Sequence, residues 1–330
     1  MRLLITIALS LFMSCLSFGQ SLFIPKETKK GERIDHKYYS IKYSKKHHQS
    51  FWVAYKLVHN KDGKHVKRKD QFKADPLIKG TSAQPSDYAR SGYDRGHLAP
   101  AADMNFNSVA MAESFYMSNM SPQAPTFNRG IWKKLEEQVR DWSEGLGTIY
   151  IVTGPILPDT LSKKIGAHKV SVPWQYYKTI LYKSPKKTSI ISLILPNKGS
   201  KRPLQDYVVT TDYLEQLTGI DFFSELSDPV ERKLEKTTNV EDWFGSSSMS
   251  NKSSVYYTTS TVKAKKESGD SKFNINTASH KQLTSIDGIG TATANKIISK
   301  RPFRSINDLL KVKGIGPATL SKIKRKAFVK

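Results

Sequence analysis

The chain has 330 residues, and its 53 Lys and Arg against 29 Asp and Glu give a net charge of +24. This length can form more than one domain with a sizeable core. Acidic residues serve solubility as well as basic ones, so the charge excess predicts a polyanionic partner, either nucleic acid or an anionic membrane surface. The only cysteine, Cys15, excludes an intrachain disulfide and a thiolate metal site.

The first twenty residues are typical of a secretory signal peptide. Arg2 precedes an apolar stretch, and small residues follow at Ser17 and Gly19. We expect a signal peptide at 1–19, which is too short to span a bilayer comfortably. Lipidation of Cys15 is a lesser alternative, because FMSC is a poor lipoprotein cleavage box. The sequence thus predicts a secreted or periplasmic protein with no cysteine and no transmembrane segment in its mature chain.

Residues 20–244 predict an α+β domain. Four stretches have the β-branched and aromatic character of strands: 50–58, 148–157, 176–183 and 188–196. A helix is expected over 128–147, ending at Gly145 or Gly147. Its apolar stripe consists of Ile131, Leu135, Val139 and Trp142. Strands and helices without regular alternation favour an α+β arrangement.

Residues 245–271 predict a flexible linker. They contain twelve Ser and Thr among 27 residues and no pattern of a core. A flexible coil of this length spans roughly 30 Å on average. Whatever follows the linker could therefore move independently.

Residues 272–330 contain an internal repeat. The stretches 283–298 and 309–324 align at an offset of 26 residues, and each has a G-I-G turn followed by a helix-forming segment. The 59 residues hold 13 Lys and Arg against two Asp, a net charge of +11. Nearly half of the excess charge therefore lies in less than a fifth of the chain.

The repeated turns predict a clamp for phosphates. A helix that begins after G-I-G presents free backbone N–H groups, and glycine lets a phosphate approach closely. The expected contacts are Gly288, Gly290, Gly314, Gly316, Lys296, Lys313, Lys322 and Lys324. Ordinary helix-to-helix turns and a solvated charged face are the alternatives. The segment 273–326 resembles the tandem helix-hairpin-helix domain of bacterial competence DNA receptors, which implies a small all-α domain that binds duplex DNA without sequence preference.

The stretch YDRGHLAPAADM at 93–104 contains a candidate general base, His97. A buried core histidine is the alternative. Asn128 heads the apolar stripe of the expected helix and could bind a hard cation such as Mg²⁺, or it could only cap the helix. Glu136 could hold water at the metal or simply pair with Arg140. Spacing alone leaves these alternatives open.

Residues 93–140 resemble the non-specific DNA/RNA endonucleases of the ββα-metal (His-Me finger) type, the family of endonuclease G. The motifs that carry the likeness are DRGH and NRG…LE, and it extends over about 35–230. The segment RKDQFKADPLI (68–78) resembles the arginine-bearing approach segment of the family. VPWQYYKTIL and DYLEQLTGIDFFSEL resemble a later strand and the closing helix.

The resemblance implies a role for each matching residue. His97 would be the general base, Asn128 the sole direct protein ligand of Mg²⁺ (or of Mn²⁺ in its place), and Glu136 would orient water at the metal. The residues that would stabilise phosphate charge are Arg68, Arg95 and Arg140. The amides that would support the site by hydrogen bonds are Asn119 and Gln123. Asp94 is expected to fix the loop, and no small-molecule cofactor is implied.

The leading hypothesis is an exported endonuclease that cuts DNA, and RNA as well, to 5′-phosphate and 3′-hydroxyl ends, with the tail as a DNA tether. The alternative is a non-catalytic DNA-binding or uptake protein on a nuclease fold. A weaker third hypothesis assigns the basic surface to an anionic membrane or envelope polymer. Five isolated histidines are expected to be surface groups: His36, His59, His65, His168 and His280. His47 and His48 are adjacent, which is poor geometry for a metal site.

Overall fold

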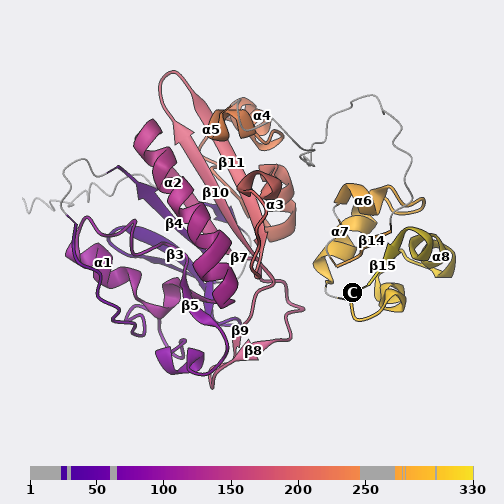
Figure 1. Ribbon diagram of the computed structural model, residues 1–330, viewed down its shortest axis with the longest axis horizontal. Coiled ribbons are helices and arrows are strands. Elements are labelled where there is room, and N and C mark those ends of the chain that lie inside the picture. Colours follow the sequence, from indigo (N-terminus) through magenta and orange to yellow (C-terminus); the bar gives the residue numbers. More distant parts are fainter. Residues whose placement is uncertain are drawn as a thin grey trace, which may run out of the picture.

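The computed structural model describes residues 24–27, 31–59, 65–245, 272–276, 278, 280–301 and 303–329. Figure 1 shows a strand-rich body, which carries helices α1 to α5, and a helical tail with α6 to α8. The expected signal peptide at 1–19 and the linker, apart from Gly245, lie outside the described residues. Among the described helices, none is both long enough and apolar enough to cross a bilayer.

A seven-stranded sheet in the order β12-β11-β10-β7-β4-β3-β2 forms the centre of the body, and all neighbouring strands are antiparallel. The strands are β2 (Glu32–Asp35), β3 (Tyr39–Ser44), β4 (Gln49–Leu57), β7 (Ile149–Pro155), β10 (Gln175–Lys183), β11 (Thr188–Pro196) and β12 (Val208–Val209). The four strands predicted from sequence are confirmed as β4, β7, β10 and β11. Sequence patterning did not identify β2, β3 and β12.

The sheet is buried on both faces because its side chains alternate between two cores. Val53 and Tyr55 of β4 pack in one core, whereas Trp52 and Ala54 of the same strand pack in the other. Helix α2 covers the first face, and α3 (Thr211–Thr218) lies over the second. This double coverage explains why the strands are apolar over most of their length.

A hairpin followed by a helix lies in the chain between strands β4 and β7 of the large sheet. Strand β5 (Asp94–His97) pairs antiparallel with β6 (Met120–Gln123), and α1 (Ser108–Ser114) and the short helix η2 (Met117–Asn119) lie between them in the chain. After β6 come the π-helical segment η3 (Phe127–Trp132) and α2 (Lys133–Leu146). This β5–β6–α2 unit is the ββα arrangement that the sequence predicted.

The helix expected over 128–147 differs in its first turns. Residues Phe127–Trp132 are π-helical, and Gly130 within them has non-helical backbone angles, φ −113° and ψ −110°. Such π-helical segments are frequent at functional sites. The predicted apolar stripe is fully buried, as the exposures of Ile131, Leu135, Val139 and Trp142 show. Burial of each such side chain stabilises the domain by roughly 1.5–3 kcal/mol. The helix ends at Gly147, whose φ of +89° favours glycine.

Shorter elements complete the body. They are β1 (Lys26–Glu27), η1 (Pro85–Tyr88), β8 (Lys164–Ile165), β9 (Val170–Ser171), η4 (Leu204–Tyr207), β13 (Ile220–Asp221), α4 (Asp228–Glu235) and α5 (Val240–Phe244). Strands β1 and β13 pair with each other, as do β8 and β9. The indole of Trp243 in α5 packs edge-on against Trp142 of α2, so α5 lies on the same side of the sheet as α2.

The tail has a core of its own, built from the repeat. Its elements are β14 (Phe273–Asn274), α6 (His280–Thr284), α7 (Thr291–Ser299), η6 (Ile306–Lys311), α8 (Pro317–Lys326) and β15 (Ala327–Phe328). Residues 26 positions apart are buried together, as in the pairs Leu283 and Leu309, Ile286 and Val312, and Ile297 and Ile323. The tail is helical as expected, apart from the two-residue parallel pair of β14 and β15 that joins its ends.

Candidate active site

Strand β5 brings three candidate residues together, and Figure 1 shows it beside the beginning of α2. Successive side chains of a strand point to opposite faces, so Arg95 and His97 share one face and Asp94 points to the other. Gly96 lies against Gln123 of β6. A Cβ at Gly96 would come within 2.2 Å of the Gln123 side chain, so the DRGH motif requires glycine there for close packing of the hairpin.

Asp94 joins the β5–β6 hairpin to the start of the helix. Its Oδ2 accepts a hydrogen bond from Asn128 Nδ2 at 2.9 Å, and Arg129 donates to both carboxylate oxygens at 2.9 and 2.7 Å. Burial alone would raise the pKa of Asp94, but the hydrogen bonds from Arg129 and Asn128 lower it below its usual value. We call this arrangement of Asp94, Asn128 and Arg129 the Asp94 clamp.

The clamp fixes the orientation of Asn128. Its Nδ2 is occupied by Asp94, and its Oδ1 has no partner in the part of the chain that the structure describes. Asn128 does not cap a helix, because the N-cap positions of η3 and α2 are Thr126 and Trp132. The amide oxygen, which is the atom that binds hard cations, is therefore oriented and available.

His97 lies between two aromatic rings. Its imidazole is 5.8 Å from the Phe72 ring and 5.0 Å from the Phe115 ring, measured between centroids. Nε2 is shielded from solvent and has no hydrogen-bond partner among the described residues. Burial, with a smaller contribution from the nearby Arg68 charge, lowers the pKa of His97 to about 3. The ring is therefore neutral at physiological pH, as a general base must be.

The same aromatic rings hold two exposed arginines near His97. The guanidinium of Arg95 lies 4.3 Å from the centroid of Phe72, and that of Arg68 lies 5.3 Å from the centroid of Phe115. Arg68 also pairs with Asp70 through an Nε–Oδ1 contact of 2.7 Å. The structure thus places Arg68, Arg95 and His97 in one group, with both positive charges on its exposed side.

Glu136 and Arg140 do not form the ion pair that their spacing allowed. Arg140 Nη1 instead contacts Asp103 Oδ1 at 3.0 Å, and Asp103 Oδ2 accepts a hydrogen bond from Tyr55 at 2.8 Å. Glu136 forms no hydrogen bond or ion pair within the described ranges. Its carboxylate is left available, whereas Arg140 is fixed by a buried partner.

Lys178 of β10 is a buried charge that the sequence analysis did not identify. Its side chain is fully buried, and Nζ lies 3.5 Å from the Leu98 carbonyl oxygen and 5.0 Å from the Trp132 ring centroid. Burial lowers the pKa of Lys178 to about 8, against the opposing effect of Glu136. Burial likewise raises the pKa of Glu136 to about 8, which Lys178 moderates. Lys178 therefore connects Glu136 electrostatically to the backbone that follows His97.

The two candidate amides behave differently. Asn119 Oδ1 accepts from Ala99 N at 2.9 Å, while its Nδ2 donates to the carbonyls of Ala99 and Ser114 at 2.9 and 2.8 Å. It therefore holds the loop after His97 in place, as a supporting residue should. The prediction of supporting hydrogen bonds by Gln123 is not met, because both of its amide atoms are buried without a partner in the described structure. Gln123 packs against Gly96 instead.

One expectation about histidines is wrong. His36 was expected on the surface, but its side chain is 1% exposed and Nε2 contacts Asp75 Oδ2 at 2.9 Å. Asp75 also accepts from Ser118, which directly precedes Asn119. The pair lies 39 positions apart in sequence, so only the fold reveals it. His168 is partly exposed and contacts Asp87.

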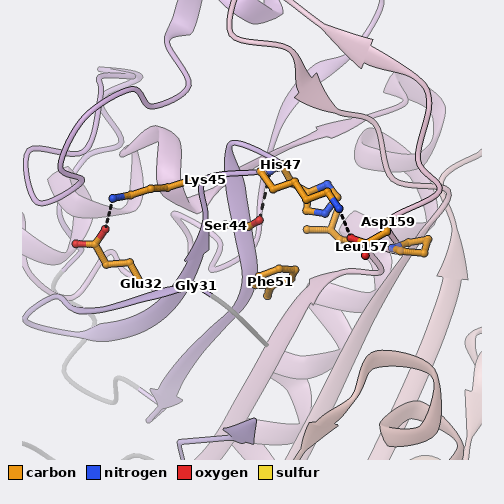
Figure 2. Close-up of a pocket in the computed structure, with 10 residues that line it drawn as sticks. Gly31, Glu32, Ser44, Lys45, His47, Phe51, Leu157 and Asp159 are labelled. Atoms are coloured by element: carbon orange, nitrogen blue, oxygen red, sulfur yellow. Dashed lines mark hydrogen bonds and ion pairs between the residues drawn. The ribbon is translucent and has the colours of Figure 1, made fainter. Parts of the chain in front are cut away.

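Two other features of the body lie apart from these residues. A pocket of about 780 Å³ is lined by residues of β2, β3, β4 and the loop after β7. Its charges pair with one another: Figure 2 shows the pair of Lys45 and Glu32. Lys46 pairs with Asp159. Two acidic groups that could hold a cation are Asp212, Glu215 and Glu235, and Asp221, Glu231 and Glu235. They belong to the α3–α4 region on the other face of the sheet, so they are separate from Asn128.

The tail forms both predicted glycine turns. Gly288 and Gly314 have φ of +87° and +106°, and Gly290 and Gly316 are the N-caps of α7 and α8. A Cβ on Gly290 or Gly316 would meet no atom within 4 Å, so the helix starts are open to a ligand. Each turn contacts the other repeat: Gly288 faces Thr319, and Gly314 faces Thr293.

The tail lysines are not equivalent. Lys322 pairs with Asp287 of the first turn, and Lys296 Nζ lies 3.5 Å from the Lys313 carbonyl of the second turn. The side chains of Lys313 and Lys324 are exposed and have no ion pair among the described residues. Because an aspartate neutralises the first turn, the second turn carries more positive potential.

Comparison with known proteins decides the family. Residues 21–229 match the model of the DNA/RNA non-specific endonuclease family. The chain belongs to this family. Residues 269–327 match the helix-hairpin-helix motif. Both matches agree with the resemblances in the sequence, and members of the nuclease family are metal-dependent.

Individual relatives cover the nuclease body. A mitochondrial nuclease EXOG from Mus musculus is 38% identical over 187 residues, which are 52% of this chain and 50% of the relative. A nuclease from Nostoc sp. is 34% identical over 209 residues, covering 60% of this chain and 75% of the relative. The chain thus spans about half the length of the EXOG relative that it matches. In a crystal structure of an EndoG/EndoGI complex, one chain matches with a TM-score of 0.57 at 30% identity, covering 63% of this chain and 91% of that one.

The residues of this endonuclease-family member suit a hard divalent cation. Asn128 offers an oriented amide oxygen and Glu136 an available carboxylate, and both are hard oxygen donors. Oxygen donors of this kind are the ligands that hard divalent cations prefer.

Proposed function

We propose that the protein is an exported, Mg²⁺-dependent endonuclease that hydrolyses phosphodiester bonds of DNA and RNA. Its products would carry 5′-phosphate and 3′-hydroxyl ends. The observation that supports this proposal most strongly is the Asp94 clamp: it orients the Asn128 oxygen from the same strand that carries the neutral His97. A base on the β5–β6 hairpin and a metal donor held against that hairpin are the minimum that water-mediated phosphodiester cleavage requires.

Each residue of the candidate active site has a separate role in the proposed reaction. Neutral His97 accepts a proton from the attacking water. Nε2 is shielded from solvent, so Nδ1 is the ring nitrogen that would take this role. Arg68 and Arg95 neutralise the phosphate from the exposed side. A bound Mg²⁺, held through Asn128 with Glu136 nearby, would supply positive charge to the phosphate and the leaving oxygen. Arg140, fixed by Asp103, adds charge behind Glu136.

The tail would act as a tether for duplex DNA. Two open helix starts and exposed lysines can grip phosphates without contacting base edges. A tether raises the effective concentration of long substrates at the active site without adding a contact there. We therefore expect the tail to act mainly on long duplexes.

One experiment tests the activity and separates it from the non-catalytic alternative. Supercoiled plasmid is incubated with the full chain and Mg²⁺, then with excess EDTA, then with Mg²⁺ restored. We expect nicking that EDTA stops and Mg²⁺ restores. His97→Ala should lower cleavage by about 10³-fold or more while leaving duplex binding unchanged. Normal cleavage by this variant would show that His97 is not the base.

Export is a separate proposal that is supported by the composition of residues 1–19. Expression with its own N-terminus in a Gram-negative host should release a protein outside the cytoplasm that begins at Gln20. Mass spectrometry of the intact protein checks this cleavage site. A lipid adduct on Cys15 would instead support the lipoprotein alternative.

A further inference from the structure

We propose that a basic and aromatic groove beside the Asp94 clamp binds the nucleic-acid strand beyond the cleaved phosphate, an inference that rests on the proposed function. The groove is formed by Tyr93, Lys163, Trp174 and the loop 197–202. The chemistry of this wall suits a sugar–phosphate backbone with bases that can stack.

The groove begins at the active site. Tyr93 directly precedes Asp94, and Gly199 N donates to Thr126 Oγ1 at 3.2 Å, two residues before Asn128. The loop is therefore in contact with the segment that leads into the metal ligand. A strand whose scissile phosphate lies at His97 and Asn128 would pass this surface next.

Asn197 makes the groove wall rigid. Its Oδ1 accepts from Ala124 N at 2.8 Å, and its Nδ2 donates to the carbonyls of Pro122 and Pro173 at 3.0 and 2.9 Å. Ala124 O in turn accepts from Asn128 N at 2.9 Å. One side chain thus ties together the end of β6, the segment before Trp174 and the helix that carries Asn128. A binding wall held in this way is fixed relative to the site.

Two lysines of the wall lack an acidic partner. Lys163 lies 4.9 Å from the ring centroid of Tyr93, and neither Lys163 nor Lys198 forms an ion pair with another described residue. Arg202 is different, because it pairs with Asp206 at 2.8 Å. Asp206 is the only carboxylate among the described residues that line this pocket, and it is already used. The net charge of the wall is therefore positive and available to phosphates.

The aromatic side chains add a surface for bases. Tyr93 and Trp174 are only partly buried, and both line the pocket. Stacking on aromatic rings tolerates any base, so it suits an enzyme without sequence preference. The pocket has a volume of about 660 Å³, and tail residues including Arg301 also line it. Both nucleic-acid-binding parts of the chain therefore meet at this groove.

The test compares a long and a minimal substrate with the full chain. Lys163→Glu/Lys198→Glu should lower kcat/KM on a single strand of about 20 nucleotides by about 10–100-fold and flatten its salt dependence. The same variant should cut a dinucleotide, which fills only the active site, within about twofold of the wild type. Trp174→Ala should also weaken cleavage of the long strand, and Trp174→Phe should restore it.

Lys186→Glu is the matched control. Lys186 is exposed in the turn between β10 and β11, at the end of these two strands that lies away from Trp174 and the loop 197–202. The Lys186→Glu substitution changes the charge by the same amount per residue as the groove variant does, and it should leave kcat/KM unchanged. An equal loss on both substrates, no loss on the long one, or a matching loss in the control would overturn the groove.

A second measurement keeps the groove separate from the proposed catalysis. In EDTA, a 4-thiothymidine strand is cross-linked to the wild type and the adducts are located by peptide mass spectrometry. Adducts at Tyr93 or Trp174 support the groove even if the wild type fails to cut. Adducts confined to tail residues that do not line the groove would contradict it.

Discussion

The nuclease body and the tail use opposite strategies to handle a phosphate. In the body, each functional side chain occurs once, and specific neighbours fix several of them: Asp94 fixes Asn128 and Asp103 fixes Arg140. Two aromatic rings hold His97. In the tail, the binding groups are backbone turns that occur twice, surrounded by lysines that are largely exposed. Catalysis requires one defined geometry of the reacting groups, whereas non-specific binding of DNA requires only a positive potential and close approach to the phosphates.

This difference predicts how each region responds to mutation. A single change in the body removes an orientation that nothing else supplies. A single change in the tail leaves a second turn and several lysines in place. Among the changes described below, all of which leave His97 in place, effects should therefore decline in the order in which they are given.

The largest effect is expected for Asp94→Ala. The substitution leaves Asn128 Nδ2 and the Arg129 guanidinium without their acceptor, and loss of such an orienting partner costs about 10–100-fold in metal affinity or activity. Cleavage measured against Mg²⁺ concentration should show a raised Mg²⁺ requirement that high Mg²⁺ partly overcomes. A fall in rate with an unchanged Mg²⁺ requirement would contradict the clamp.

Lys178→Met should act through the protonation of Glu136. Because burial raises the pKa of Glu136 to about 8, its ionised form increases as pH rises through that value, and cleavage should increase with it. Removing the Lys178 charge raises this pKa further, so the rising limb should move to higher pH and the rate at pH 7 should fall by about tenfold. Pre-steady-state rates from pH 6 to 10 check the shift.

Two companion variants control the Lys178 result. Glu136→Gln should remove the rising limb, and adding Lys178→Met to it should then cause no further shift. Lys178→Met leaves Glu136 buried without a counter-charge, so the melting temperature should fall and should partly recover in the double variant. A shift of equal size in both backgrounds would show that Lys178 acts elsewhere.

Deletion of 272–330 should have an intermediate effect on binding and little effect on chemistry. Duplex affinity at low salt should fall by about tenfold, and the slope of log K against log salt should become shallower. Cleavage of a short oligonucleotide should stay within about twofold, because the body has its own cores. An unchanged salt slope would rule out the tail as a clamp.

The smallest effects belong to single tail residues, and they should reveal the asymmetry between the turns. Lys313→Ala should weaken duplex binding by about two- to threefold. Lys322→Ala should weaken it less, because Lys322 already pairs with Asp287. Fluorescence anisotropy with a labelled duplex measures both, and Asp287→Asn should strengthen binding. The reverse order would place the main grip at the first turn.

Sequence patterns predicted the parts of this molecule that depend on local periodicity. The apolar stripe from Ile131 to Trp142 and the 26-residue repeat are visible in the chain because burial imposes a fixed spacing. The pattern of the sequence also identified His97 and Asn128 as candidates, and the resemblance to the nuclease family assigned them their roles. The structure then showed that Asp94 acts on Asn128, a link across 34 positions that spacing cannot reveal.

The residues that sequence reasoning missed are a buried charge within a strand and a buried pair whose members lie far apart in the sequence. Lys178 reads as a lysine in the middle of YYKTILYK, and only the alternation of its neighbours placed it on a core face. Tyr176 and Ile180 share that face, so the signal was present, but nothing local showed that Glu136 lies opposite. The π-helical start of the helix and the buried His36–Asp75 pair likewise depend on tertiary contacts.

The two turns of the tail pack against each other's repeat, and this packing affects how the tail folds. Gly288 lies against Thr319 and Gly314 against Thr293, so each hairpin completes the other. Neither repeat can melt without exposing the core that both share, and the tail should unfold in one cooperative transition. A single repeat would then not fold and would not bind DNA. The two repeats together are therefore the smallest functional unit, and neither can replace the other.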